Sequence, residues 1–221
     1  MTAINIIKKP DEIIVITDGA MTSELGTVQL ISSKVTLLPI APAMIAVRGP
    51  WPLAHLLGMR ATCDGWSFDE LARNISPLAK QIVKEAPHFA DSEITIAGYS
   101  EVGQCLVTYL LPCDHRYLAH GMHPFSMHER HDEIISGPTP SAEGMRLAGF
   151  VCPQARDFDP DTHGVALVAA QRLTPEWSRG IGGFVQVSTV TKDTVSSRIV
   201  HRWAEDEIGQ RIDDLSIRPA A

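Results

Sequence analysis

Short apolar runs, separated by Pro, Asp and Gly, occupy the first 47 residues of the chain. Runs of four or five apolar and β-branched residues that are bounded by turn residues are typical of β-strands. The pattern therefore predicts strands at Ala3–Ile7, Ile13–Thr17, Val28–Ser32, Lys34–Leu38 and Met44–Val47.

A helical period replaces this pattern in the middle of the chain. Ser67 and Glu70 have the spacing of a capping box, in which the two side chains bond the free N–H groups at a helix start. Pro77 interrupts the helix, so we expect a kink or a restart there, with Ser76 as a second N-cap. The apolar residues at helical spacing are Phe68, Leu71, Ile75, Leu78 and Ile82.

Strands and helices alternate once more towards the C-terminus. Helices are expected at Ser141–Phe150 and Thr162–Leu173, because apolar residues recur there at helical spacing. The expected strands are Ile94–Tyr99, Cys105–Leu111, Ile134–Ile135, Phe184–Val190 and Thr194–Val200.

This order of elements predicts an α+β fold. Strands joined by short turns pair antiparallel, and their apolar faces must be covered. We therefore expect two packed antiparallel sheets with helices on their outer faces, a four-layer α-β-β-α sandwich. Residues 1–203 are expected to form one domain, and residues 204–221 a charged C-terminal tail.

The composition and charge of the chain disfavour some kinds of binding partner and some cellular locations. The formal net charge of −7 disfavours nucleic acid and anionic membranes, since both attract clustered Lys and Arg. The uncharged stretch Val35–Val47 is too short to span a bilayer and contains two prolines. The first residues carry charges where a signal peptide needs an apolar region. We therefore expect a cytoplasmic protein whose four cysteines are reduced thiols.

The first two strands bring candidate chemistry together. If their hairpin is symmetric about Pro10, Thr2 lies opposite Asp18. Lys34 begins another strand sixteen residues after Asp18. A threonine hydroxyl is a poor nucleophile without a base, but removal of Met1 frees an α-amine with a pKa of about 7.7–8.0 that can take its proton. A nearby ammonium would stabilise the alkoxide, and an aspartate would orient that ammonium.

These residues resemble the active site of the proteasome β-subunit family of N-terminal nucleophile (Ntn) hydrolases. Members begin with a threonine, and an aspartate and a lysine follow it by sixteen and thirty-two residues, which is the spacing of Thr2, Asp18 and Lys34. The stretches IIVITDGAM, SSKVTLLP, MIAVRGP and ITIAGYSEVGQCLVTYLL also resemble the family's strands.

The resemblance implies a function and an assembly. It implies a proteasome-like fold and a threonine-type peptidase or amidohydrolase that needs no cofactor, with a backbone N–H near Arg48 or Gly49 as oxyanion donor. Ser136, in EIISGPTPSAEGM, would correspond to the serine near the family's nucleophile. Family members form rings, so the resemblance implies a homo-oligomer, peptide or protein substrates, and an unfoldase as a further partner.

The chain departs from the family pattern in two segments. Arg48 stands where active members have glycine. Ser178 and Ile181 replace the family's Asp-x-x-Ser pair before Gly182. A second hypothesis therefore stays open, in which the chain keeps Met1 and the fold but serves as a non-catalytic structural or assembly protein.

Histidines cluster between Cys113 and His131. Their spacing matches no closed zinc site and no HExxH frame, so no metal is expected. A polar loop, or a subunit contact that responds to pH, is the favoured interpretation. The clustered residues are His115, His120, His123, His128 and His131.

Overall fold

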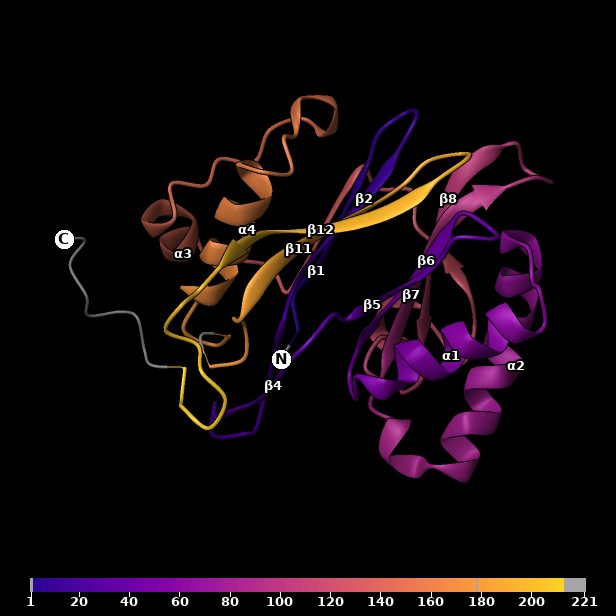
Figure 1. Ribbon diagram of the computed structural model, residues 1–221, viewed down its shortest axis with the longest axis horizontal. Coiled ribbons are helices and arrows are strands. Elements are labelled where there is room, and N and C mark those ends of the chain that lie inside the picture. Colours follow the sequence, from indigo (N-terminus) through magenta and orange to yellow (C-terminus); the bar gives the residue numbers. More distant parts are fainter. Residues whose placement is uncertain (1, 178, 213–221) are drawn as a thin grey trace.

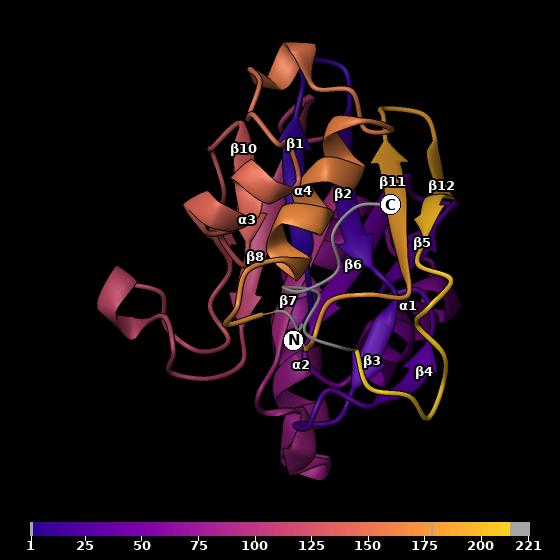
Figure 2. The ribbon, with the colours of Figure 1, turned by 90° about the vertical axis from the view of Figure 1, so that its left-hand side faces the viewer.

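A computed structural model describes residues 2–177 and 179–212 of the chain. Two larger antiparallel sheets and a small ribbon carry the described strands. The first sheet has the order β10 (Ile134–Gly137), β1 (Ile4–Lys8), β2 (Ile13–Asp18), β11 (Phe184–Val190) and β12 (Val195–Arg202), which can be followed in Figure 2. The second sheet has the order β5 (Val35–Leu38), β6 (Ala43–Arg48), β7 (Glu93–Ser100), β8 (Cys105–Pro112) and β9 (His128–Glu129). The ribbon pairs β3 (Ala20–Thr22) with β4 (Val28–Ile31).

Helices cover the outer face of each larger sheet. In Figure 1 the layers run from α3 and α4 through the two sheets to α1 and α2. An apolar cluster that includes Ile6, Val15 and Met44 fills the space between the sheets, and separate clusters lie beneath the two helix pairs. The predicted α+β class with antiparallel sheets is confirmed. The helices are α1 (Pro52–Cys63), α2 (Phe68–Glu85), α3 (Ala142–Leu147) and α4 (His163–Arg172).

Helix α2 runs through its proline. The predicted capping box forms, since Ser67 Oγ accepts the Glu70 N–H and the Glu70 carboxylate accepts the Ser67 N–H. Of the kink or restart expected at Pro77, the restart is wrong, because one helix spans Phe68–Glu85 and Ser76 Oγ donates to the Phe125 carbonyl and caps no helix. Pro77 removes one backbone donor, and the tertiary contacts of the apolar face keep the helix in one piece.

The first hairpin has a different register from the expected one. Its loop is Pro10-Asp11, closed by a 2.9 Å bond from the Lys9 N–H to the Glu12 carbonyl. Proline favours the first loop position of such a turn because its φ is fixed there. The centre of the hairpin therefore lies after Pro10, and the register predicted from symmetry about Pro10 is wrong by one residue. The pairs run from Ile4 opposite Thr17 to Lys8 opposite Ile13.

The packed domain continues beyond residue 203, where a charged tail was expected to begin. Asp206 is buried and makes a two-pronged ion pair with Arg172 of α4, with N···O distances of 2.7 and 2.8 Å. The Gln210 carbonyl accepts the Val28 N–H, and Ile212 is buried beside β4. Residues 204–212 therefore belong to the folded unit, and residues 213–221 lie outside the described part of the chain.

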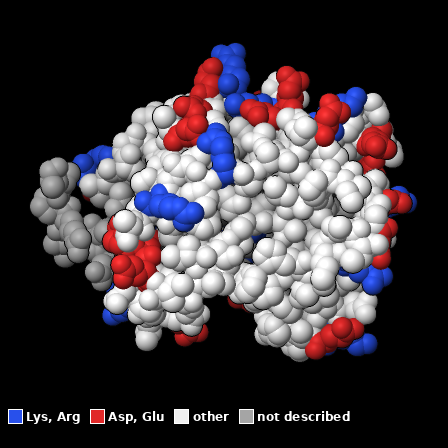
Figure 3. Space-filling view, in the orientation of Figure 1, with Lys and Arg blue, Asp and Glu red and all other residues white. Residues whose placement is uncertain are grey.

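Charge on the visible surface is mixed. Figure 3 shows Lys, Arg, Asp and Glu together along the upper edge of one face, and few charged residues over its middle. Among the described residues, no helix is both long enough and apolar enough to cross a membrane.

Candidate active site

Asp18 is the centre of a buried hydrogen-bond cluster. It ends β2 and is fully removed from solvent. Its Oδ1 accepts bonds from Lys34 Nζ at 2.7 Å and from the Ala3 N–H at 2.9 Å. Its Oδ2 accepts the Gly182 N–H at 3.1 Å. Three donors from separate segments thus fix the carboxylate, as buried charges require.

Lys34 enters this cluster from the residue before β5. Its side chain is 3% exposed and lies 2.7 Å from the Asp18 carboxylate. Burial lowers the pKa of Lys34, because it strips water from the ammonium; Asp18 opposes this shift, and the nearby Arg48 cation adds to it. The lysine is therefore easier to deprotonate than an exposed one.

Thr2 lies two residues before β1, the first paired strand of the hairpin. It is 6% exposed. Ala3, and not Thr2, comes level with Asp18, so the aspartate holds the N–H of the Thr2–Ala3 peptide. On the other side of this peptide, the Thr2 carbonyl accepts a 3.3 Å bond from Arg48 Nε. Met1, whose removal decides whether Thr2 has a free amine, lies outside the described residues.

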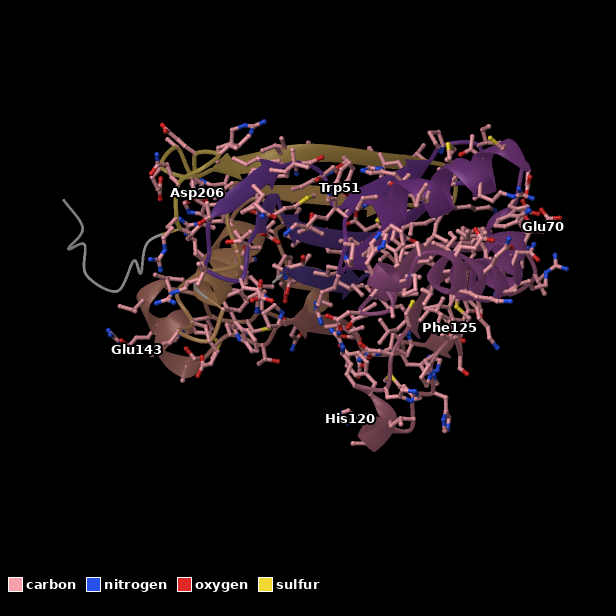
Figure 4. All side chains as sticks on the ribbon, turned by 90° about the horizontal axis from the view of Figure 1, so that it is seen from below. Trp51, Glu70, His120, Phe125, Glu143 and Asp206 are labelled. Atoms are coloured by element: carbon pink, nitrogen blue, oxygen red, sulfur yellow. The ribbon has the colours of Figure 1, made fainter. Side chains whose placement is uncertain are left out.

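A cavity of about 610 Å³ opens beside these residues. Thr2 and Lys34 are on its wall, together with residues from β3, the β6–α1 connection and the segment before β7. Figure 4 shows Trp51 near the middle of the molecule, between the half with Asp206 and the half with Glu70. The remaining lining includes Ala20, Met21, Thr22, Glu24, Gln29, Arg48, Gly49, Pro50, His88, Asp91 and Arg116.

Arg48 ends β6, and Gly49 follows it on the wall of this cavity. Gly49 has a φ of +135°, and a Cβ there would lie 2.7 Å from Ser92 Oγ and 2.8 Å from the Asp91 carbonyl. Only glycine fits such a position without strain. Both residues predicted near the oxyanion therefore line the same cavity as Thr2.

Ser136 is not brought to this cavity. It lies on β10 opposite Asn5 and lines a second cavity of about 170 Å³, which Arg48 also borders. The family resemblance implied that Ser136 lies near the nucleophile, but its position on β10 places it at the second cavity instead. The geometry gives Ser136 no contact with Lys34 or Asp18 among the described hydrogen bonds.

The Gly182-Gly183 segment before β11 contacts Asp18 through a backbone N–H. Gly182 donates its N–H to Asp18, and Ile181 is fully buried in an apolar cluster. Ile181 offers no hydroxyl where the resembling family has a serine. Ser178 lies outside the described residues.

Sequence reasoning missed two side chains that shape the site. Glu93 opens β7 directly opposite Arg48 and pairs with it at 3.0 Å. Tyr117, in the histidine-bearing loop, bonds both of them. Burial and the Glu93 charge raise the pKa of Tyr117 to about 12, so it stays a neutral hydroxyl. Correct pairing of β6 with β7 would have revealed the Arg48–Glu93 pair from the sequence.

The histidine cluster belongs to the surface around this loop. The described residues contain no group of three or more His, Cys, Asp or Glu side chains arranged to hold a metal ion. A short helix at Leu118–His120 stands out from the body of the molecule, with His120 at its end (Figure 4). His131 lies 3.3 Å from Glu129 on the exposed surface.

Comparison with known proteins adds no relative. No protein-family model matches the chain, and no curated protein matches it in sequence.

Proposed function

We propose that this protein is an N-terminal-threonine amidohydrolase of the proteasome-like Ntn type, which cleaves amide bonds in peptides or proteins. The observation that carries the proposal is the buried Lys34–Asp18 pair, 2.7 Å long, on the wall of the cavity that Thr2 also lines. Lys34 is buried, has a lowered pKa and lines the same cavity as Thr2, and perturbed pKa values of this kind cluster at functional sites.

Each residue has a role in the proposed reaction. After removal of Met1, the Thr2 amine takes the proton of its own hydroxyl as the oxygen attacks the substrate carbonyl. The Lys34 ammonium stabilises the developing alkoxide, and Asp18 holds Lys34 in place. A backbone N–H at Gly49 binds the oxyanion of the tetrahedral intermediate. The amine then returns the proton to the leaving nitrogen, which gives an ester on Thr2 that water hydrolyses.

The fold supports this assignment to a family. Two antiparallel sheets packed face to face, with a helix pair on each outer face, agree with the α-β-β-α sandwich that the resemblance implies. The N-terminal strand lies inside the first sheet, between β10 and β2, so the nucleophile sits at the end of a rigid element.

The proposed substrate is an extended peptide, and the proposed assembly is a homo-oligomeric ring. The open cavity of about 610 Å³ has the size of a site for a few side chains. The ring is proposed from the family resemblance alone. Light scattering should find a multimer at micromolar concentration, and a stable monomer would contradict the assembly.

A second candidate function is a non-catalytic structural or assembly role. Two residues favour it. Arg48 occupies a position that is a glycine in active members of the family that the chain resembles, and the buried Ile181 occupies the position of that family's serine. In that case Met1 is retained and the Lys34–Asp18 pair serves folding alone.

Turnover of fluorogenic peptides by matched variants tests the proposal. Thr2→Ala should abolish hydrolysis, because it removes the hydroxyl on which the proposed ester forms. Thr2→Ser keeps both hydroxyl and amine, and should retain activity within about 100-fold of the wild type. Arg146→Met, which breaks an exposed ion pair with Glu143, is the control and should leave turnover unchanged. Hydrolysis that survives Thr2→Ala would rule out Thr2 as the nucleophile.

A further inference from the structure

The peptide bond between Thr2 and Ala3 is held from both sides by charged groups. Its N–H donates to the Asp18 carboxylate at 2.9 Å, and its carbonyl accepts from the Arg48 guanidinium at 3.3 Å. Because the peptide unit is planar, two bonds on opposite edges fix its orientation. The Thr2 Cα belongs to this planar unit, so the two bonds fix where it lies, and the hydroxyl and the main-chain nitrogen can then move only by rotation about the single bonds of Thr2.

Arg48 is itself fixed by two partners on the side away from the cavity. Glu93 faces it across the β6–β7 pair and accepts from its Nη1 at 3.0 Å. The Tyr117 hydroxyl accepts from the same nitrogen at 3.3 Å and donates to the Glu93 carboxylate. The side chains of Arg48 and Glu93 are 17% and 7% exposed, so little water competes for these bonds.

The backbone leaves room for this guanidinium. A Cβ on Gly137 would lie 2.2 Å from Arg48 Nη2. Gly137 ends β10, the edge strand beside β1, so the guanidinium crosses from the second sheet to the first. An arginine built into both sheets in this way is part of the framework of the site.

We propose that Arg48, held by Glu93 and Tyr117, is a positioning residue that fixes the Thr2–Ala3 peptide and so sets the nucleophile over Lys34. The arginine takes no proton and touches no substrate in this role. The part of the inference that concerns reaction rate rests on the proposed function, whereas the part that concerns the fixed peptide does not.

The first measurement separates reaction from binding. A β-lactone probe gives a rate of covalent bond formation, kinact, and a binding constant, KI. Arg48→Met should lower kinact by at least about 30-fold and change KI by less than about threefold, because the nucleophile is misplaced while the cavity stays open. Arg48→Lys keeps a positive charge and should recover part of kinact. The recovery should be incomplete, because one ammonium cannot bond the Thr2 carbonyl in the same geometry while it pairs with Glu93. Arg146→Met is the matched control and should change neither constant.

The second measurement needs no activity. Residue-resolved hydrogen exchange at the Ala3 amide should accelerate at least about tenfold in Arg48→Met and stay unchanged in Arg146→Met, because loss of the carbonyl bond lets the peptide open. Tyr117→Phe removes one hydroxyl from the network. It should lower kinact and accelerate Ala3 exchange, each by less than Arg48→Met does. If Arg48→Met does not fold, Arg48→Lys and Tyr117→Phe take its place in both measurements.

The outcomes are distinguishable. Labelled wild type with an unchanged kinact in Arg48→Met overturns the positioning role and leaves the proposed function standing. If the wild type is not labelled at all, the proposed function fails, and Ala3 exchange alone decides whether Arg48 fixes the peptide. Unchanged Ala3 exchange overturns the inference in either case.

Discussion

Lys34 Nζ lies 2.7 Å from Asp18 Oδ1, and the two side chains are 3% and 0% exposed. Each of these buried groups depends on the other for its charge partner, although Asp18 also accepts two backbone N–H groups. A pair of this kind gives little net stability, but removal of one partner leaves the other charge unpaired in the interior.

Lys34→Met should lower the free energy of unfolding by about 3–5 kcal/mol, because Asp18 then keeps a buried charge without its cation. Chemical denaturation measures the change. The double variant Asp18→Asn/Lys34→Met should be less destabilised than the sum of the two single variants, since both remove the same interaction. Additive effects would mean that the two side chains are energetically independent.

Stability should depend on pH through Lys34. Its pKa is lowered in the folded state by burial, from an ordinary value of 10.5. Below 10.5 and above the folded pKa, the unfolded chain therefore binds more protons at this residue, and the free energy of unfolding rises with pH. The stability of the wild type relative to Lys34→Met should accordingly increase as the pH rises through this window. A difference that falls as the pH rises would contradict the burial of Lys34.

The segment after residue 203 should contribute to stability through Asp206. Asp206→Ala leaves the buried Arg172 without its two-pronged partner, and we expect a loss of about 3–5 kcal/mol. Its neighbour Glu205 also approaches Arg172, at 3.6 Å, but is half exposed, so Glu205→Ala should cost about 0–1 kcal/mol. Equal effects of the two variants in chemical denaturation would show that residues 204–212 do not pack as described.

The four cysteines should differ in reactivity. Cys63, Cys105 and Cys152 are exposed free thiols, whereas burial raises the pKa of Cys113 to about 12. Since the thiolate is the reactive form, iodoacetamide at about pH 8 should modify the three exposed residues and spare Cys113 until the protein unfolds. Peptide mass spectrometry locates the modified residues, and rapid alkylation of Cys113 in the native protein would contradict its position.

The strands and the Lys34–Asp18 contact could be predicted from the sequence. Apolar runs bounded by turn residues determine where β1, β2, β5 and β6 lie, because buried strands leave that pattern. The family resemblance carried by Thr2, Asp18 and Lys34 implied one site, and the structure brings the last two into contact.

Two other features were predicted wrongly, the first because the turn preference of proline was overlooked and the second because it depends on tertiary packing. The loop at Pro10-Asp11 shifted the hairpin by one residue, so Asp18 bonds the Ala3 N–H where Thr2 was expected opposite it. Pro77 stayed inside α2 because packing outweighed the lost donor.

The hydrogen-bonded group of Arg48, Glu93 and Tyr117 was not predicted from the sequence either. Glu93 and Tyr117 are 24 residues apart in the chain, yet they bond each other and Arg48 in the structure. The correct register of β6 against β7 would have placed Glu93 opposite Arg48, but no sequence pattern in the loop that carries the histidines points to Tyr117.

Intact and peptide mass spectrometry of the protein, with and without a β-lactone probe, tests the central claim most directly. The account predicts that Met1 is absent and that one probe molecule is bound through the Thr2 hydroxyl as an ester. It also predicts that Thr2→Ala and a form whose Met1 cannot be removed stay unlabelled, since one lacks the hydroxyl and the other the amine base. Met1 intact and no adduct on Thr2 in the wild type would contradict the catalytic account and leave the structural role as the function of the fold.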